Sequence, residues 1–248
     1  MVEAPAMDPF DPIIEMRRVT FAHPERPAVL RDLNLRLRKG DRAGLVAPNG
    51  SGKSTLFHLV MGLIKPQSGE SHVFGKPVRE EKDFIEVRRR VGLLFQDSDD
   101  QLFSPTVIED VAFGPLNLGL GRVKALERAE KTLSSLNLLS YRDRVTARLS
   151  GGEKRLVALA TVLSMEPEVL LLDEPTTGLD TETRERITDM LKGLDVTYLI
   201  ISHNFDFLSH LTDVVFTLDN GRLTRAQTVR IHRHVHAHPM GGVPHEHP

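Results

Sequence analysis

The chain of 248 residues has no cysteine, no tryptophan and only two tyrosines. Without cysteine the protein cannot form a disulfide, a thiolate zinc site, an iron–sulfur cluster or a cysteine nucleophile. An excess of charge of one sign is missing too, because 34 acidic residues stand against 32 basic ones, a net charge of −2. Such a balanced composition supplies no electrostatic field for nucleic acid, so we expect no nucleic-acid partner.

Long apolar runs are also absent. A helix that crosses a bilayer needs about 20 mostly apolar residues, whereas the unbroken aliphatic stretches here are as short as Val169–Leu172. Residues 1–12 contain three acidic residues and three prolines, without the basic-then-apolar order of a signal peptide. We therefore expect a flexible leader over residues 1–12, and a chain that reaches a membrane only through partner proteins.

The remaining sequence alternates between strand and helix patterns. Short apolar runs predict strands at 43–47, 91–95, 169–172 and 196–201, and weaker patterns predict strands at 33–38, 71–74 and 213–218. Helices are predicted at 54–63, 123–139 and 181–194. Proline and glycine interrupt the stretch from Asp97 to about Thr146, which we interpret as a mostly helical lobe inserted into the sheet domain. Alternating strands and helices predict an α/β fold with a mostly parallel core sheet.

A glycine-rich turn follows the strand at 43–47 and precedes a helix. Glycines allow backbone N–H groups to turn toward phosphate oxygens, and the helix N-terminus adds partial positive charge. Lys53 would reach the β- and γ-phosphates, and the Ser54 hydroxyl would bind Mg²⁺. The strict motif begins with glycine where this chain has Ala47. The predicted nucleotide-binding residues of this loop are Asn49, Gly50, Ser51, Gly52, Lys53, Ser54 and Thr55.

Two carboxylates follow the apolar run Val169–Leu172, at the carboxyl end of a buried strand, where open α/β sheets bind ligands. Asp173 is placed to hold Mg²⁺ through water, and Glu174 is placed to polarise an attacking water molecule. By itself this pattern could equally be a solvated acidic turn. Its pairing with the glycine-rich loop favours a site for ATP and Mg²⁺.

The segment Leu149-Ser150-Gly151-Gly152-Glu153 decides between these interpretations. It resembles the signature of ATP-binding-cassette (ABC) ATPases, and residues 13–225 are similar to that family in the order of six motifs. The resemblance implies an ABC-type P-loop NTPase with an antiparallel β subdomain and a helical subdomain at about 97–160. It also implies a homodimer in which each ATP lies between Lys53 of one subunit and Ser150, Gly151 and Gly152 of the other.

Further residues take their expected roles from this resemblance. Gln96 matches the glutamine that senses Mg²⁺ and the γ-phosphate, and His203 matches the switch histidine. Asp180 belongs to the segment that resembles the D-loop. His23 occupies the position of the aromatic that stacks on adenine, and Phe21 is a second candidate, although the sequence favours a strand-core role for Phe21. The expected catalytic set is thus Glu174, His203, Gln96 and Lys53, with Ser54, Gln96 and Asp173 around Mg²⁺.

Residues 99–107 and 109–115 resemble a narrower branch, the ATPases of energy-coupling-factor importers, and among them those that serve cobalt or nickel. The resemblance implies a membrane coupling subunit and a membrane substrate-binding subunit as partners, and a peripheral position on the cytoplasmic face of the cell membrane. Two alternatives stay open: a vitamin importer of the same architecture, or a soluble DNA- or ribosome-acting ABC ATPase. The short interval from Asp97 to Leu149, without heptads, speaks against the second.

Six of the 11 histidines fall in the last 17 residues. Imidazole is a ligand for Co²⁺ and Ni²⁺, so the tail at 226–248 is either a metal-binding segment or a polar tail with adventitious affinity. Arg88, Arg89 and Arg90 likewise suit either an acidic partner or a solvated helix end. The candidate metal ligands of the tail are His232, His234, His236 and His238.

Overall fold

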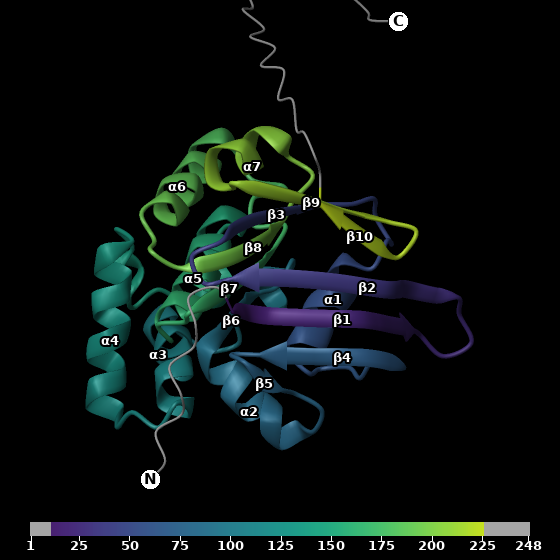
Figure 1. The fold of residues 1–248 in the computed structure, drawn as a ribbon. Coiled ribbons are helices and arrows are strands. Elements are labelled where there is room, and N and C mark those ends of the chain that lie inside the picture. The colour runs from purple at the N-terminus through teal and green to yellow at the C-terminus, as the bar shows by residue number, and fades with distance from the viewer. Residues whose placement is uncertain (1–10, 226–248) are drawn as a thin grey trace, which may run out of the picture.

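The computed structural model describes residues 11–225, which form two β-sheets with helices around them (Figure 1). The larger sheet has the strand order β10-β9-β3-β8-β7-β6. Its strands are β3 (Arg42–Val46), β6 (Val91–Leu94), β7 (Val169–Asp173), β8 (Thr197–Ile201), β9 (Val214–Asp219) and β10 (Arg222–Arg225). All neighbours in it are parallel except β9 and β10, which form an antiparallel hairpin. The predicted mostly parallel α/β core is thus confirmed.

The smaller sheet is antiparallel and has the order β2-β1-β4-β5. It consists of β1 (Pro12–Ala22), β2 (Ala28–Arg38), β4 (Ser68–Val73) and β5 (Lys76–Pro77). In β2 the side chains of Leu33, Leu35 and Leu37 are buried while the polar residues between them are exposed. This period of two places one face of the sheet on the core and the other in solvent.

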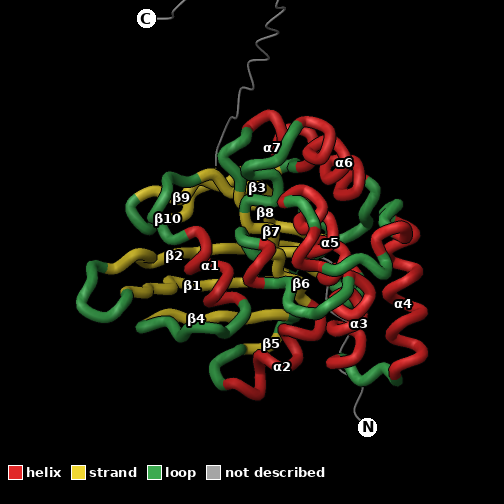
Figure 2. The backbone as a smooth tube through the Cα atoms, turned by 180° about the vertical axis from the view of Figure 1, so that it is seen from behind, coloured by secondary structure: helices red, strands yellow, loops and turns green. Residues whose placement is uncertain are grey.

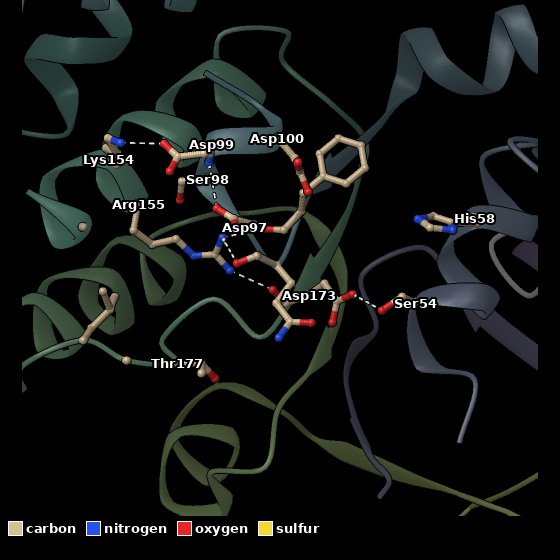
Figure 3. Close-up of a pocket in the computed structure, with 15 residues that line it drawn as sticks. Ser54, His58, Asp97, Ser98, Asp99, Asp100, Lys154, Arg155, Asp173 and Thr177 are labelled. Carbon is tan, nitrogen blue, oxygen red and sulfur yellow. Dashed lines mark hydrogen bonds and ion pairs between the residues drawn. The ribbon is translucent and has the colours of Figure 1, made fainter. Parts of the chain in front are cut away.

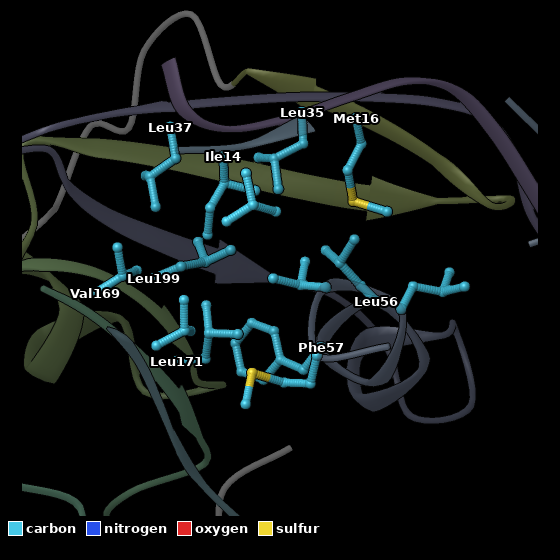
Figure 4. Packing of buried hydrophobic residues seen from close by; sticks show 14 of the residues in the cluster. Ile14, Met16, Leu35, Leu37, Leu56, Phe57, Val169, Leu171 and Leu199 are labelled. Atoms are coloured by element: carbon cyan, nitrogen blue, oxygen red, sulfur yellow. The ribbon is translucent and has the colours of Figure 1, made fainter. Parts of the chain in front are cut away.

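Helix α1 (Lys53–Val60) lies between the two sheets, where its buried side chains join their inner faces (Figure 1). Figure 4 shows Met16 and Leu35 of the antiparallel sheet, Phe57 of α1 and Leu171 and Leu199 of the parallel sheet in one apolar cluster. Because α1 follows directly on β3, this packing fixes the glycine-rich turn between them.

The other helices are α2 (Glu81–Arg90), α3 (Val107–Asn117), α4 (Arg122–Ser135), α5 (Gly151–Leu163), α6 (Thr181–Lys192) and α7 (Phe205–Leu211). The helices α3, α4 and α5 lie together at one end of the molecule, and α6 and α7 lie against the parallel sheet near β8 (Figure 2). Their apolar faces and the second face of the parallel sheet form another buried cluster. Among residues 11–225, no helix combines the length and apolar character required to cross a bilayer.

Some sequence predictions need correction. The expected leader included Pro12, but β1 begins at that residue. The helix predicted to reach residue 139 ends at Ser135, because Asn137 adopts a positive φ of 56° that no α-helix continues. Helix α7 was not predicted; α3 was expected only as part of the helical lobe, α2 only as a helix end at Arg88–Arg90, and β1 only as strand core around Phe21. The expected His-rich tail and residues 1–10 of the leader lie outside the described residues.

Candidate functional site

The predicted site residues gather at the carboxyl ends of neighbouring strands of the parallel sheet. Strand β8 lies between β3 and β7, and β6 pairs with the other edge of β7. Lys53 follows β3, His203 follows β8 and Gln96 follows β6, while Asp173 is the last residue of β7. Parallel strands bring such segments to one edge, so residues up to 150 positions apart meet there.

The turn between β3 and α1 depends on glycine. Gly52 has a φ of +101°, and a Cβ there would lie 2.6 Å from Val29 Cγ1. Gly50 also has a positive φ, of +75°, in open surroundings. Any other residue at position 52 would be strained and would clash. The side-chain hydroxyl of Ser51 is buried and has no hydrogen-bond partner among the described residues.

The Lys53 ammonium is buried in this turn. Its Nζ donates to the carbonyl oxygens of Ala47 at 2.8 Å and Pro48 at 3.2 Å, and lies 2.8 Å from His203 Nε2. Burial lowers the pKa of Lys53, and the nearby carboxylates of Glu174 and Asp173 oppose that effect. The loop therefore holds the Lys53 ammonium in a fixed position through two backbone carbonyls, and this cation is already largely removed from water.

Ser54 and Asp173 connect the loop to strand β7. The Ser54 hydroxyl donates to Asp173 Oδ2 at 2.6 Å, as Figure 3 shows. Burial is the main cause that raises the pKa of Asp173, while the bond from Ser54 lowers it. The other carboxylate oxygen, Oδ1, is buried and has no partner within residues 11–225. One buried oxygen thus remains available beside a serine hydroxyl, which is a donor set that suits Mg²⁺.

Glu174 is held in an unusual backbone conformation directly after the strand. Its φ is +46°, in the left-handed region that non-glycine residues rarely adopt. The Thr177 hydroxyl donates to Glu174 Oε2 at 2.8 Å, which orients the carboxylate. The second oxygen, Oε1, is 3.3 Å from His203 Nε2 but accepts no hydrogen bond from any described residue. The side chain is only 5% exposed, so this oxygen is an acceptor kept away from bulk water.

The imidazole of His203 faces both the loop and the acidic strand. Besides Lys53, its Nε2 lies 3.0 Å from Asn49 Oδ1. One ring nitrogen cannot accept from Lys53 and donate to Asn49 at the same time, so only one of these contacts is a hydrogen bond in any given state. The histidine side chain is therefore poised to exchange partners.

Gln96 is exposed and lines a cleft of about 680 Å³ that extends from Ser54 and Asp173 to Gly151 at the start of α5. Acidic residues border this cleft in the segment that follows β6, as Figure 3 shows for Asp97 and Asp99. Lys154 pairs with Asp99 across the cleft, with 2.5 Å between Nζ and Oδ1.

Ser150 caps helix α5. Its Oγ accepts from the Glu153 N–H at 3.3 Å, and Glu153 Oε2 accepts from the Ser150 N–H at 2.8 Å, which completes a capping box. Gly151 is exposed, and a Cβ added there would meet no other described atom within 4 Å, whereas a Cβ at Gly152 would lie 3.1 Å from Thr183 Oγ1. Asp180 caps α6 by accepting from both the N–H and the hydroxyl of Thr183. Both motif segments therefore have local structural roles as well.

The adenine-stacking position was open between two rings. Phe21 is buried, at 8% exposure, and belongs to the apolar core. His23 is exposed, and its ring meets that of Phe21 edge-on with 5.0 Å between centroids. The burial of Phe21 leaves His23 as the ring that solvent or a ligand can reach. Thr55, also predicted in the nucleotide site, is half-buried in the first turn of α1.

Arg155 was missed by the sequence reasoning, although it joins the predicted site. It is 4% exposed and donates hydrogen bonds to the carbonyl oxygens of Phe95, Gln96, Asp173, Glu174 and Pro175. Figure 3 shows its guanidinium between the segment after β6 and the end of β7. The available signal was a basic residue at the start of the apolar run 156–163 in a helix.

The arginine cluster in the last turn of α2 has partners within the chain. Arg88 donates to the Met61 carbonyl and pairs with Glu81, and Arg90 pairs with Glu168 at 2.6 Å. The structure thus favours the structural interpretation of Arg88 and Arg90 and leaves Arg89 exposed. His232, His234, His236 and His238 lie outside the described residues.

Comparisons with known proteins agree with this geometry. The family model described as "ABC transporter" matches residues 30–177. A putative ABC transporter ATP-binding protein of Nitratidesulfovibrio vulgaris is 49% identical over 239 residues, which cover 96% of this chain and 87% of the relative. The energy-coupling factor transporter ATP-binding protein EcfA of Methanothermobacter thermautotrophicus is 44% identical, with 85% and 69% covered. The cobalt import ATP-binding protein CbiO of Rhodobacter capsulatus is also 44% identical, with 86% and 77% covered.

Among solved structures, CbiO1 of Clostridium perfringens, titled as part of the ABC transporter complex cbiONQ, superposes with a TM-score of 0.76. It is 35% identical, and the match covers 86% of this chain and 87% of that one. The similarity extends over nearly all of residues 11–225, so it includes both sheets and the helical region as well as the phosphate loop. The chain belongs to the ABC transporter ATPases, in the energy-coupling-factor branch that contains EcfA and CbiO.

Proposed function

We propose that this chain is the ATP-hydrolysing subunit of an energy-coupling-factor importer for a transition metal, cobalt or nickel, and that it works as a homodimer closed around ATP. The observation that carries the proposal is the convergence of Lys53, Asp173, Glu174 and His203 at one edge of the parallel sheet, where Lys53 follows β3, His203 follows β8, and Asp173 and Glu174 stand together at the end of β7. Phosphoryl transfer needs positioning and charge stabilisation of this kind.

Lys53 and the backbone N–H groups of residues 49–55 would hold the phosphates of ATP. The lysine exchanges carbonyl contacts for phosphate oxygens, which stabilises the charge that develops as the terminal phosphoryl group departs. The orphaned Ser51 hydroxyl lies in the same turn and would gain a partner there. His23 would support the adenine ring from outside the loop, through its exposed imidazole.

Ser54, Asp173 and Gln96 would hold Mg²⁺. The free buried oxygen of Asp173 and its short bond to Ser54 fit such an ion, because Mg²⁺ prefers oxygen ligands and keeps several waters. When bound, Mg²⁺ neutralises the charge on the phosphates. A bound cation would also stabilise the ionised form of Asp173, because burial disfavours the charge of this carboxylate.

Glu174 would accept a proton from the attacking water through Oε1. Its carboxylate is oriented by Thr177 and is shielded from solvent, and its unpartnered oxygen points to the side of His203. A general base contributes about 10²–10⁴-fold to a rate when it is held within hydrogen-bond distance of the proton. His203 would exchange its contact with Lys53 or Asn49 for one with the γ-phosphate. In that position it would keep the attacking water aligned with the carboxylate of Glu174.

The dimer would complete each site from outside. A Cβ added at Gly151 would meet no other described atom within 4 Å, and this glycine lies at the N-terminus of a helix of 13 residues, where phosphate oxygens are attracted by the exposed N–H groups. Ser150, Gly151 and Gly152 of one subunit would therefore face the Lys53 loop of the other. Asp180, at the start of α6, would lie along the same interface.

The membrane subunits would dock on the helical region. Phe103 and Phe113 form an edge-on pair with 4.7 Å between ring centroids, and they are 64% and 44% exposed. Leu116 and Val123 add further exposed apolar surface on α3 and α4. An exposed apolar cluster of this type marks a protein interface. Nucleotide binding would be passed to this apolar cluster through the segment from Gln96 to Phe103, because that segment connects the nucleotide cleft to the cluster.

Cobalt or nickel as substrate has the least support within the described chain. No group of three or more histidine, aspartate or glutamate side chains within residues 11–225 is arranged to hold a metal ion. The proposal for the metal rests on the similarity to CbiO and on the histidines at 232–238, and a vitamin is the competing substrate class.

Uptake measurements separate these substrates. The full chain, expressed with its membrane partners, is tested for co-purification and for ATP-dependent uptake of Co²⁺ and Ni²⁺, with Glu174→Gln as the inactive control. Uptake of either metal that stops in the control supports the proposal. Assembly with partners but no uptake of either metal would assign the complex to another substrate. Deletion of residues 232–248 then tests the tail: an unchanged metal response would identify it as a polar appendage.

A further inference from the structure

The environment of Arg155 is unusual for a cation. The guanidinium has five N–H donors, and each meets one backbone carbonyl: Nε binds Pro175 O, Nη1 binds Phe95 O and Gln96 O, and Nη2 binds Asp173 O and Glu174 O. The distances are 3.0 Å to Pro175, 3.2 Å to Gln96, 2.7 Å to Asp173 and 2.8 Å to Glu174. No carboxylate within residues 11–225 forms a salt bridge with it, although the charges of Asp173, Asp97 and Glu174 are near.

Stability alone does not account for such a residue. Burying a cation against neutral carbonyls carries a large desolvation cost, and an apolar side chain would pack a helix on a sheet more favourably. The same burial lowers the pKa of Arg155 to about 10, so the group stays charged at neutral pH. What this arrangement provides is control of backbone geometry, because the planar guanidinium fixes the directions from which its five carbonyl acceptors can bind.

The five carbonyls belong to the two segments that carry the proposed sensor and general base. Three of them, at residues 173–175, are consecutive, so the guanidinium fixes the peptide planes on both sides of Glu174. These bonds stabilise the positive φ of 46° that aims the Glu174 side chain. The other two carbonyls fix the backbone at Gln96. Arg155 itself belongs to α5, whose first residue is Gly151.

We infer that Arg155 is a positioning residue that locks Gln96 and Glu174 to the signature helix of the same chain, and thereby connects the two nucleotide sites of the dimer. The inference rests on the proposed function, because α5 begins with the glycines that would contact the partner's ATP. A shift of α5 on nucleotide binding would then move the base and the sensor of its own site. Arg155 touches neither nucleotide nor water in this scheme.

Arg155→Lys is the variant that tests this inference. Lysine keeps the charge but has three donors on one atom, so at least two of the five carbonyls lose their partner. We expect kcat for ATP hydrolysis to fall about 10- to 100-fold, with the Kd for ATP within about twofold of the wild type. The Hill coefficient for ATP should fall toward 1. Arg155→Met, which has no donor, should give the larger loss.

Tyr198→Phe is the matched control. It removes a buried hydrogen bond to the Leu211 carbonyl, on the side of β8 that packs against α7, away from Arg155. The melting temperature of every variant is recorded with the kinetics of the full-length protein. An Arg155→Lys protein that matches Tyr198→Phe in both Tm and kcat would overturn the inference. So would a loss of ATP affinity equal to the loss in kcat.

The same experiment separates the two proposals. A wild-type chain that neither binds nor hydrolyses ATP would refute the proposed function. A wild-type chain that hydrolyses ATP, beside an Arg155→Lys variant with unchanged kcat and Hill coefficient, would refute only the role of Arg155.

Discussion

Asp110 on α3 is a buried carboxylate that ties down the loop in front of its helix. It is 3% exposed. Its Oδ1 accepts from the backbone N–H groups of Phe103 at 3.1 Å and Ser104 at 2.8 Å, and its Oδ2 accepts from the Thr146 hydroxyl at 3.0 Å. Alanine at this position removes both acceptor oxygens and with them all three hydrogen bonds. Asparagine keeps one oxygen for both N–H groups and offers an N–H to Thr146, whose hydroxyl oxygen can accept.

The magnitudes follow from these contacts. A hydrogen bond to a charged group contributes about 1.5–3 kcal/mol, and a buried donor without a partner costs about 1–3 kcal/mol. Phe103 is 64% exposed, so water can reach part of the released backbone and reduces the loss. We expect Asp110→Ala to lower the free energy of unfolding by about 3 kcal/mol, and Asp110→Asn by about 1 kcal/mol, since only the charge is lost.

Urea denaturation of the full chain, followed by circular dichroism, measures both losses. Thr146→Val is the control for the Oδ2 contact alone and should cost about 1 kcal/mol. The surface around Phe103 should also lose order in Asp110→Ala, which protease digestion of the loop detects. Equal losses for the alanine and asparagine variants would refute the reasoning, because they would show that the charge matters and the three hydrogen bonds do not.

Three further perturbations test the site and the sheet. Glu174→Gln should bind ATP but lose about 100-fold or more in turnover and accumulate as a closed dimer on gel filtration; normal turnover would contradict its role as base. Lys53→Ala should weaken ATP binding about 100-fold or more, and unchanged affinity by calorimetry would rule out the phosphate site. Arg17 and Arg36, 2.7 and 2.8 Å from Glu15, hold the pKa of Glu15 below its usual range. Their stabilisation is present at pH 7 and lost as pH falls through that lowered pKa, so the Tm gap between wild type and Glu15→Gln should narrow once the pH falls below 4.5, the ordinary pKa of glutamate, and close when Glu15 is protonated in the folded protein; a gap that stays constant would refute it.

The core strands could be predicted because helices or the second sheet cover both faces of them, and every residue of β7 and β8 is buried. Strand β1 could not, because its burial does not alternate. Ile13, Ile14, Glu15 and Met16 are buried in succession, and the pairing shifts register around Arg18, which has a φ of 50°. A bulge of this kind changes the face to which side chains point, and no period of two survives in the sequence.

Helix α3 was missed for a different reason. It contains Gly114 and Pro115, which local rules count as helix breakers. In the fold, a Cβ at Gly114 would lie 2.6 Å from Met165 Cγ, so glycine is what allows α3 to approach the end of α5. Pro115 is one of the buried residues of the helix. Tertiary packing therefore outweighs the local propensity here.

The candidate site divides in the same way. Lys53, Ser54, Asp173 and Glu174 could be predicted because each lies within a few residues of a strand end and belongs to a motif with fixed spacing. Arg155 could not, because all of its acceptors are backbone carbonyls, which leave no trace in residue identity. Its partners lie about 60 residues before it and about 20 after it, so only the order of strands β6 and β7 in the sheet brings them to one point.

The positions of Gly151, Gly152 and Arg155 on α5 suggest that the signature segment has a mechanical role in addition to phosphate binding. Gly151 and Arg155 are four residues apart, so they lie on one face of the helix, and both line the cleft that contains Ser54 and Asp173. Gly152 instead faces Thr183 of α6, and a Cβ at Gly152 would lie 3.1 Å from the Thr183 hydroxyl oxygen. A phosphate bound at the N-terminus of α5 would therefore act on a helix with two attachments. One turn later, Arg155 connects the helix to Glu174, and at Gly152 the helix contacts Thr183 in the first turn of α6. Only Gly152 is crowded within its own chain, whereas a Cβ at Gly151 would meet no other described atom within 4 Å, so Gly151 leaves that space open for the proposed phosphate. Under the inference above, Arg155 would pass a shift of α5 on to Glu174.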